Sequence, residues 1–300
     1  MTSGSTIRCG LIGAGIQQSL SPAMHEQEAR SQGLRCEYKL IDLDVLGVGV
    51  EALSRLIENV RQQNYTGLNI TYPCKQAVLP LLDELSDEGR SLGAVNTIVF
   101  RDGRMTGHNT DWSGFAASFQ RGLPGAAIDR VVQLGAGGSG AAVAHAALTL
   151  GTGQLIVFDI DASRAVGLCE NLSRRFGEGR ALAGKELADA MPSADGLIHC
   201  TPTGMAKWPG MPLPASLLEP RHWIAEIVYF PLETELLRVA RARGCRTLDG
   251  GGMAVFQAAG AFRLFTGRDA DAARMEAHFR ALVGSQSGGG GGNRTRVRKP

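Results

Sequence analysis

Lys75, Asn96 and Asp111 are polar residues whose types and positions could carry out chemistry on a small molecule. Lys75 ends GLNITYPCK (67–75), Asn96 lies within AVNT (94–97), and Asp111 lies within GHNTDWSGF (107–115). A lysine and an aspartate beside a substrate hydroxyl can take its proton or stabilise charge on its oxygen. Each residue also has a structural alternative: a solvated surface charge for Lys75, a turn for Asn96, and the cap of the following helix for Asp111.

Two glycine turns follow apolar strand patterns, and the second matches a dinucleotide-binding turn. It lies in VVQLGAGGSGAAVAHAAL (131–148) and comprises Gly135, Ala136, Gly137, Gly138, Ser139 and Gly140. Glycines at its first, third and sixth positions allow a tight turn and close approach of a pyrophosphate, while the helix N-terminus supplies free N–H groups. Asp159 ends the next strand pattern, where an acid can bond the ribose hydroxyls. We therefore assign a dinucleotide to this turn.

The first glycine turn, in GLIGAGIQQSLSPAMH (10–25), lacks two of these features. Gln18 replaces the third glycine, and Pro22 restricts the backbone of Ser21, so the helix is expected to begin near Ser21. Ser19 and Ser21 would then offer two hydroxyls near a helix N-terminus, which suits a carboxylate. The alternative is that Ser21 is simply an N-cap.

Short runs rich in Val and Ile alternate with helical patterns, which predicts an α/β fold with mainly parallel sheets. The predicted strands are 7–13, 36–42, 66–71, 131–135, 154–159, 196–200, 223–229 and 245–248. Segment 94–111 interrupts this order, and its Asp102-Gly103 pair predicts a hairpin. The residues AVLPLLDEL (77–85) are expected to form a helix. A first domain is expected before about residue 112, and a second βαβ set from about 129 to 249.

The composition is that of a globular protein without a nucleic-acid or membrane signature. The chain has 300 residues, of which 44% are hydrophobic and 20% charged. Residues 284–300 carry four basic groups and no acid, and the rest of the chain has 27 basic and 29 acidic residues. This near-neutral balance does not indicate the excess of basic residues that binding to nucleic acid or to an anionic membrane requires. The Gly-rich segment 284–300 is predicted to be a flexible tail outside the fold.

Neither a membrane helix nor a metal site is expected. No apolar run reaches the roughly 18 residues that a membrane helix needs, and the N-terminus lacks a signal-peptide pattern, so a cytoplasmic location is expected. The six cysteines stand singly, without a Cys-x-x-Cys, and the six histidines form no HExxH or other ligand pattern. Free thiols are the expected state of the cysteines.

Six motifs in order make the chain similar to the shikimate dehydrogenase family, including its quinate/shikimate branch. They are Ser-Leu-Ser-Pro (19–22), Asn-x-Thr-x-Pro-x-Lys (69–75), Ala-Val-Asn-Thr (94–97), Asn-Thr-Asp-x-x-Gly-Phe (109–115), Gly-Ala-Gly-Gly (135–138) and GGGMAVFQAAGAF (250–262). The resemblance covers residues 7–283. It implies two α/β domains with the active-site cleft between them: a substrate-binding catalytic domain of residues 1–112 plus 250–283, and a Rossmann-type dinucleotide-binding domain of residues 113–249.

The activity implied by the resemblance is reversible transfer of a hydride between a nicotinamide and C3 of a hydroxylated ring carboxylate such as shikimate. The implied substrate contacts are Ser19, Ser21 and Tyr229 to the carboxylate, and Thr71, Asn96 and Gln257 to ring hydroxyls. Lys75 and Asp111 would flank the reacting hydroxyl, whose proton must leave when the hydride leaves. The sequence leaves open which of the two takes that proton.

The cofactor preference depends on FDIDASRA (158–165). Family members usually carry Asn-Arg-Thr after this strand, and its Arg receives the 2′-phosphate of NADP. Asp159 and Asp161 stand there instead, so NAD is favoured. NADP stays open, because Asp161 also suits a helix cap and Arg164 could turn back toward the phosphate. Further implied cofactor contacts are Thr201, Thr203, Met205 and Gly250.

The turn before Ser19 departs from the family, because it reads Ala-Gly-Ile-Gln-Gln where a His often precedes Ser-Leu-Ser. The substrate therefore stays open among shikimate, quinate and aminoshikimate. A non-catalytic NAD-binding regulatory protein is the alternative of another class, although such a protein has no need of Lys75 and Asp111 together. The expected partner is a small-molecule substrate, and the expected state is a monomer or homodimer.

Overall fold

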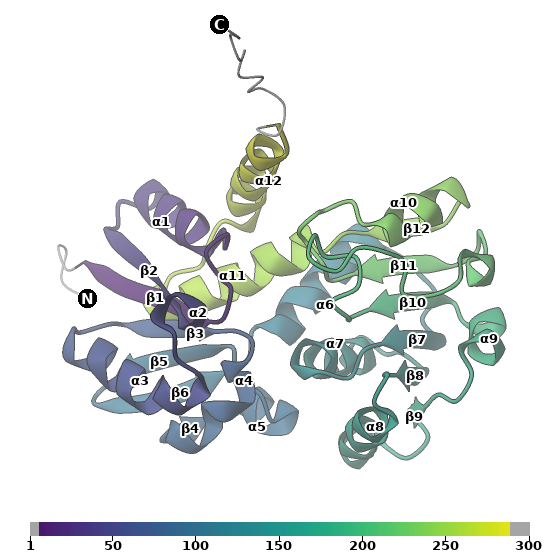
Figure 1. Ribbon diagram of the computed structural model, residues 1–300, viewed down its shortest axis with the longest axis horizontal. Helices are drawn as coiled ribbons and strands as arrows, with labels where there is room; N and C mark the ends of the chain where they lie inside the picture. Colours follow the sequence, from purple (N-terminus) through teal and green to yellow (C-terminus); the bar gives the residue numbers. More distant parts are fainter. Residues whose placement is uncertain (1–5, 289–300) are drawn as a thin grey trace, which may run out of the picture.

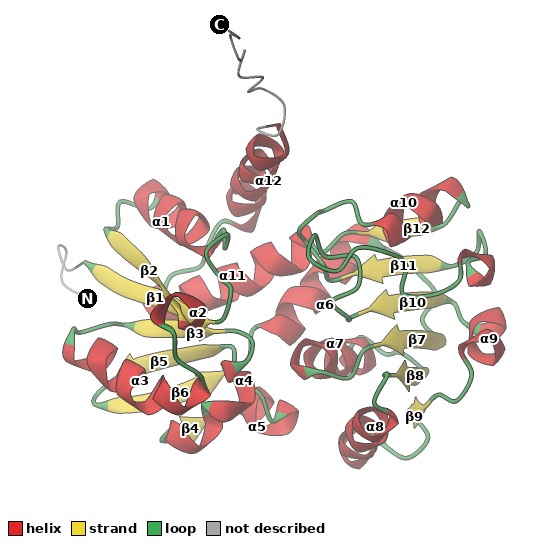
Figure 2. Ribbon diagram, viewed as in Figure 1, coloured by secondary structure: helices red, strands yellow, loops and turns green. Residues whose placement is uncertain are grey.

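The computed structural model describes residues 6–288, which form two α/β lobes side by side (Figure 1). The first lobe is purple to blue and the second is teal to green, and helix α11 (Gly251–Thr266) runs between them. In each lobe a sheet carries helices on its faces (Figure 2). The predicted α/β class, with two sheet-centred regions, is confirmed. None of the helices in residues 6–288 combines the length and the apolar character needed to cross a membrane.

Six strands form the first sheet in the order β2-β1-β3-β5-β6-β4. They are β1 (Ile7–Gly13), β2 (Cys36–Asp42), β3 (Gly67–Ile70), β4 (Glu84–Leu85), β5 (Thr97–Arg101) and β6 (Arg104–His108). β1 pairs in parallel with β2 on one side and with β3 on the other. Strand order therefore reverses at β1 and β3, and the carboxyl ends of such strands are where α/β sheets bind ligands.

The predicted hairpin is confirmed as β5 and β6, which pair antiparallel. Asp102 and Gly103 connect them with φ angles of 52° and 75°. Positive φ at both central residues defines the turn type whose twist matches that of the flanking strands. β3 also pairs antiparallel with β5, so the first sheet is mixed.

The helix predicted at 77–85 is wrong. Helix α4 (Cys74–Ala77) is short, a 3₁₀ turn follows at Leu79–Leu81, and the chain then enters β4. Pro80 lacks an N–H and would clash with the preceding helical turn, so the segment cannot continue as one helix. The other helices of this lobe are α1 (Ser21–Ser31), α2 (Leu43–Leu46), α3 (Leu53–Gln62) and α5 (Asp87–Leu92), with a 3₁₀ turn at Val50–Ala52.

The second sheet has six parallel strands in the order β12-β11-β10-β7-β8-β9, the doubly wound order of a Rossmann fold. The strands are β7 (Arg130–Leu134), β8 (Gln154–Phe158), β9 (Ala181–Ala183), β10 (Gly196–His199), β11 (Trp223–Glu226) and β12 (Arg246–Leu248). The helices are α7 (Gly138–Thr149), α8 (Ala162–Phe176), α9 (Leu187–Ala190) and α10 (Glu235–Ala242), with 3₁₀ turns at Met191–Ser193 and Ala215–Leu217. Strand order reverses between β7 and β10, next to the second glycine turn.

Helices α6 (Asp111–Gly122) and α11 join the lobes and pack closely along each other. A Cβ on Gly114 would lie 2.7 Å from the backbone nitrogen of Gln257, so this contact requires glycine. The predicted domain boundary after residue 112 falls inside α6. Helix α12 (Ala272–Gly288) packs on α1 and continues past Gly284, where the flexible tail was expected to begin; residues 289–300 lie outside the described part of the chain.

Candidate active site

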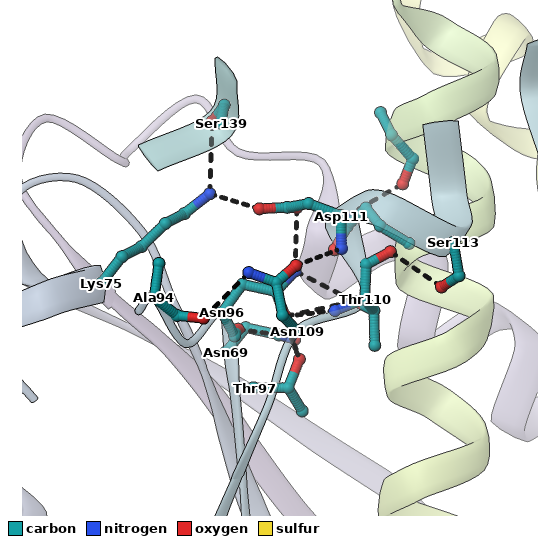
Figure 3. Close-up of polar contacts among 12 residues, drawn as sticks. Asn69, Lys75, Ala94, Asn96, Thr97, Asn109, Thr110, Asp111, Ser113 and Ser139 are labelled. Carbon is teal, nitrogen blue, oxygen red and sulfur yellow. Dashed lines mark hydrogen bonds and ion pairs between the residues drawn. The ribbon is translucent and has the colours of Figure 1, made fainter. Parts of the chain in front are cut away.

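Lys75 and Asp111 form an ion pair where the two lobes meet (Figure 3). Lys75 Nζ lies 2.6 Å from Asp111 Oδ2, and the two side chains are 16% and 8% exposed. Lys75 lies on α4, directly after β3, and Asp111 is the first residue of α6. The positive end of the α6 dipole favours a carboxylate at this position. A proton donor and a proton acceptor are thus held in contact with little solvent around them.

Asn96 fixes the orientation of the Asp111 carboxylate. Its Nδ2 donates to Asp111 Oδ1 at 2.8 Å and to Thr110 Oγ1 at 3.0 Å, and its Oδ1 accepts from the Thr110 N–H at 2.8 Å. The Asp111 N–H donates to Asn109 Oδ1 at 3.0 Å. With Oδ1 bonded to Asn96, Oδ2 is the oxygen that faces Lys75.

A buried polar chain lies behind Asn96, and sequence reasoning missed it. Asn69 Nδ2 donates to Thr97 Oγ1 at 3.0 Å, and Asn69 Oδ1 accepts from Tyr38 Oη at 2.8 Å. Burial raises the pKa of Tyr38 well above 10, so its phenol keeps the proton that it donates. Asn69 stands in the otherwise apolar strand GLNI, and a buried polar side chain requires hydrogen-bond partners. This residue could therefore have indicated a buried polar network from the sequence.

Ser19, Ser21 and Thr71 lie beside the first glycine turn. Ser19 Oγ donates to Ser21 Oγ at 3.2 Å and accepts from the Ser21 N–H at 3.3 Å. Helix α1 begins at Ser21 as predicted, but its N-cap residue is Leu20 and has no side-chain bond, so the N-cap alternative for Ser21 is wrong. Thr71 packs on Gly13, where a Cβ would lie 2.3 Å from Thr71 Cγ2.

The second glycine turn has the geometry of a dinucleotide cradle. Gly135 adopts φ +100°, and a Cβ on Gly140 would lie 2.3 Å from the Gly135 carbonyl oxygen, so both positions require glycine. A Cβ on Gly137 would meet no atom within 4 Å, which leaves open space in front of the turn. Gln133, which the sequence reasoning did not select, donates to the carbonyl oxygens of Gly135 and Gly140 at 2.9 Å each.

The structure brings this turn to the Lys75–Asp111 pair. Ser139 Oγ lies 3.4 Å from Lys75 Nζ, across the junction of the lobes (Figure 3). Desolvation, together with the negative charge of Asp111, raises the pKa of Tyr229, which lies in the segment after β11. Gln257 contacts α6 through its backbone, and its Nε2 donates to the Ala254 carbonyl in its own helix. The reacting centre would therefore lie between the two glycine turns.

Asp159, Asp161 and Arg164 lie at the outer side of the second turn. Asp159 Oδ2 accepts from the Ala136 N–H at 2.7 Å, and its Oδ1 accepts from the Asp161 N–H at 2.9 Å. Asp161 is the N-cap of α8. The helix-cap alternative for Asp161 is confirmed. Arg164 pairs with Asp161 at 3.4 Å and is 63% exposed.

The loop after β10 carries Thr201, Thr203 and Met205. Thr201 Oγ1 lies 2.5 Å from Nε2 of the buried His199 and accepts from the Thr203 N–H at 3.3 Å. Met205 lines a cavity of about 300 Å³ with Phe230, Pro231 and other residues, separate from Lys75. Gly250 precedes α11 and lies against the segment that follows β11, where a Cβ would be 2.4 Å from the Val228 carbonyl oxygen. The loop and Gly250 thus border the second sheet at its carboxyl edge.

The described residues suit a dinucleotide but not a metal ion. Residues 6–288 contain no group of three or more His, Cys, Asp or Glu side chains arranged to hold a metal ion. The glycine cradle, by contrast, fits a dinucleotide, because the open space at Gly137 and the start of α7 suit a pyrophosphate.

Two family models match the chain. Residues 11–98 match the shikimate dehydrogenase substrate binding domain, and residues 250–278 match the shikimate 5'-dehydrogenase C-terminal domain. A shikimate dehydrogenase (NADP(+)) of Streptomyces avermitilis is 61% identical over 278 residues, which cover 92% of this chain and 96% of the relative. The chain belongs to the shikimate dehydrogenase family. A quinate/shikimate dehydrogenase (NAD(+)) of Corynebacterium efficiens is 47% identical, with 92% and 99% covered.

Solved structures of the shikimate dehydrogenase family share the whole fold. The quinate dehydrogenase of Corynebacterium glutamicum in complex with NAD has a TM-score of 0.87 and 46% identity, with 92% of this chain and 99% of that chain covered. A shikimate 5-dehydrogenase of Thermus thermophilus in complex with NADP(H) and shikimate has a TM-score of 0.81 and 36% identity, with the same coverage. The resemblance inferred from the sequence motifs is confirmed.

Proposed function

We propose that the protein is an NAD(P)-dependent oxidoreductase that oxidises shikimate or quinate at a ring hydroxyl and catalyses the reverse reduction. The observation that carries this proposal is the Lys75–Asp111 pair, held at 2.6 Å and in contact with Ser139 of the glycine cradle. Such a pair beside a nicotinamide site suits the removal of a hydroxyl proton during hydride transfer. Membership of the shikimate dehydrogenase family supports the choice of substrate class.

The proposed division of labour follows the two lobes. Residues 1–112 plus 250–283 would form the substrate-binding domain, and residues 113–249 the dinucleotide-binding domain. The contacts of α11 with β1 and β5 support assigning the last helices to the first lobe. The substrate's carboxylate would bond to Ser19, Ser21 and Tyr229, and its ring hydroxyls to Thr71, Asn96 and Gln257.

The chain's own residues supply positioning and a path for the proton. Lys75 would donate to the reacting oxygen and stabilise the charge that develops there, while Asp111 holds the ammonium in place. Asn96 fixes Asp111, so the pair keeps one geometry. A nicotinamide in the second turn would accept the hydride. In the oxidation direction the hydroxyl proton would pass to Lys75 as Lys75 passes one of its own protons to Asp111 Oδ2, and both transfers would reverse in the reduction.

We propose that NAD is favoured over NADP. Asp159 already bonds to the Ala136 N–H, and the remaining lone pairs of its carboxylate can accept from ribose hydroxyls. A 2′-phosphate would place like charge beside Asp159. Arg164 pairs with Asp161 rather than facing the turn alone, which weakens the case for a phosphate site there. The relatives include enzymes named for NADP(+) and enzymes named for NAD(+), so the proposed preference for NAD rests on the residues of this chain.

Steady-state oxidation of shikimate and of quinate, each with NAD and with NADP, tests the proposal. We expect turnover of at least one acid, with NAD giving the higher kcat/KM. Lack of turnover with all four combinations would favour the non-catalytic NAD-binding alternative, provided that NAD still binds. Quinate turnover above shikimate turnover would indicate a catabolic enzyme of the quinate type.

A further inference from the structure

The Asp42 carboxylate lies beneath the first glycine turn and accepts four hydrogen bonds. The residue ends β2 and is 3% exposed. The donors are the Gly15 N–H (3.0 Å) and Asp44 N–H (3.1 Å) to Oδ1, and the Ile16 N–H (3.0 Å) and Gln17 Nε2 (2.9 Å) to Oδ2. Two of these donors are backbone groups of the glycine turn itself. An internal anion thus occupies the place where this kind of turn would bind a phosphate.

The charge of Asp42 is well compensated. Burial alone would raise the pKa of Asp42, but the hydrogen bonds from Gln17, Asp44, Gly15 and Ile16 outweigh it and lower the pKa below 3.8. The carboxylate is therefore ionised at neutral pH. Hydrogen bonds to an ionised acceptor are about twice as strong as those between neutral groups.

Ile16 connects Asp42 to the serines. Its N–H donates to Asp42, and its carbonyl oxygen accepts from the Ser19 N–H at 2.9 Å. Ser19 Oγ in turn bonds to both the backbone and the hydroxyl of Ser21. The position of both hydroxyls thus depends on a path of three hydrogen-bonded steps that begins at Asp42.

The second turn offers an internal comparison. Asp42 is the last residue of β2 and Asp159 directly follows β8, so each acid stands at the carboxyl end of the second strand of its lobe. Asp159 accepts one N–H from its glycine turn, that of Ala136, whereas Asp42 accepts two and a side-chain amide as well. Asp42 therefore closes the first glycine turn, whereas Asp159, at the corresponding place in the other lobe, leaves the second turn open to a ligand.

We propose that Asp42 is a positioning residue for the substrate's carboxylate: it closes the first glycine turn and fixes the loop that presents Ser19 and Ser21. The inference rests on the proposed function. It also accounts for a chain with two glycine turns and one dinucleotide, because the N–H groups of Gly15 and Ile16 are directed at Asp42.

The test compares Asp42→Asn with the wild type in steady-state kinetics. Asparagine keeps the size of the side chain, removes the charge, and turns an NH₂ group toward N–H donors. We expect KM for shikimate and quinate to rise about ten-fold or more, the effect of losing one or two charge-assisted bonds. We expect kcat and KM for NAD to change by less than about three-fold, well below one decade.

Shikimate methyl ester makes the test specific to the carboxylate. If Asp42 acts through the groups that bind the carboxylate, the KM increase caused by Asp42→Asn is smaller with the ester than with the acid. Asp44→Asn is the matched control, because it removes an exposed acid two residues away. Gln17→Ala removes the hydrogen bond that the exposed Gln17 side chain donates to Asp42. We expect this variant to raise KM for the acid by about two- to five-fold. It decides the question if Asp42→Asn does not fold.

Each outcome separates the two proposals. An active wild type whose KM for the acid is unchanged in Asp42→Asn and Gln17→Ala overturns the role of Asp42 alone. An equal rise in KM for NAD and for the acid also overturns it, since a general loss of structure would do the same. A wild type that oxidises neither acid overturns the proposed function, and the role of Asp42 with it.

Discussion

Lys75 has two polar partners among the described residues, Asp111 Oδ2 at 2.6 Å and Ser139 Oγ at 3.4 Å. An ammonium carries three N–H donors, so one is available to a substrate oxygen. Asp111 in turn is fixed by Asn96, and Asn96 by Thr110. Each member of the proposed acid–base pair is therefore oriented by a second group, as positioned acid–base catalysis requires.

Lys75→Met tests this arrangement, because methionine keeps the length of the side chain and removes the charge. We expect kcat to fall by about two to four decades, the scale for losing a positioned acid–base or electrostatic group. NAD binding, followed by fluorescence titration, should change little. Lys39→Met, at an exposed lysine of β2, is the control and should keep wild-type turnover. Near-normal kcat in Lys75→Met would remove Lys75 from the mechanism.

Asp159→Asn tests the cofactor preference at a single residue. Repulsion of the 2′-phosphate and the loss of ribose hydrogen bonds should favour NAD by about 2–4 kcal/mol in the wild type, or about 30- to 1000-fold in kcat/KM. In Asp159→Asn this preference should shrink, mainly through better use of NADP. Asp189→Asn is the matched control, because it removes one exposed carboxylate of the same lobe that lies outside the proposed cofactor contacts. A wild type that already prefers NADP would contradict the argument.

Helix α12 is attached to the first lobe by an ion pair between a buried carboxylate and a partly exposed arginine. Glu28 on α1 has a fully buried side chain, and Arg274 on α12 bonds to its two oxygens at 2.7 and 2.8 Å. Burial would raise the pKa of Glu28, but Arg274, the Asp271 N–H and Gln32 outweigh it, so the pKa is lowered from its ordinary value of 4.5. A carboxyl whose pKa is lowered by folding stabilises the fold above its ordinary pKa, and this stabilisation is lost as the pH falls through the folded pKa.

Arg274→Ala should therefore be strongly destabilising at pH 7 and less so in acid. Removing Arg274 leaves the buried Glu28 carboxylate with only the hydrogen bonds from Gln32 Nε2 and the Asp271 N–H, so the free energy of unfolding should fall by more than it does when an exposed pair is broken. Below pH 4.5 Glu28 can take up a proton, and the difference from the wild type should narrow. Urea unfolding at pH 7 and pH 4 measures both values. Arg263→Ala is the control: it breaks an exposed pair with Asp269 and should lower the free energy of unfolding by less than about 1 kcal/mol. An equal loss of stability in both variants would show that the Glu28–Arg274 pair stabilises the fold no more than an exposed pair does.

Some elements could be predicted from the sequence because their signals are local. β1 and β2 have the predicted bounds, and the Asp102-Gly103 hairpin needs only its own turn residues. The helix prediction for 77–85 was wrong because the apolar residues have helical spacing but Pro80 prevents one continuous helix. The strand predicted at 223–229 ends at Glu226, since the apolar run continues past the edge of the sheet.

The candidate site could be predicted in its residues but not in its contacts. Lys75 and Asp111 were selected by type and by position at the ends of elements, yet they lie 36 positions apart along the chain. Their contact depends on how β3 and α6 are placed, which no local pattern records. Asp42 was missed for the same reason: helix α1 and the rest of strand β2 separate it from its partners Gly15 and Ile16 along the chain.

At the scale of the whole molecule, each lobe buries a histidine whose pKa is lowered in the folded protein. His25 packs against Tyr38, Phe262 and Phe265 with ring centroids 4.8–6.1 Å apart, and its Nε2 has no hydrogen-bond partner among the described residues. Burial lowers the pKa of His25 to about 3. Burial, with the charge of Arg175, lowers the pKa of His145 to about 4. Both histidines therefore take up protons on unfolding in mild acid.

The sign of this effect makes the fold sensitive to acid. Between pH 6.5 and about 3 the unfolded chain binds a proton at His25 that the folded chain does not, so stability falls as the pH falls. One such proton corresponds to a slope of about 1.4 kcal/mol per pH unit. His25→Phe keeps a ring among the aromatic neighbours and removes the proton site. We expect the unfolding free energy of this variant, measured in urea at pH 7, 6, 5 and 4, to fall less steeply than that of the wild type. His145→Phe in the same chain should reduce the slope again, and a slope identical to that of the wild type in His25→Phe would show that His25 is not held neutral in the folded protein.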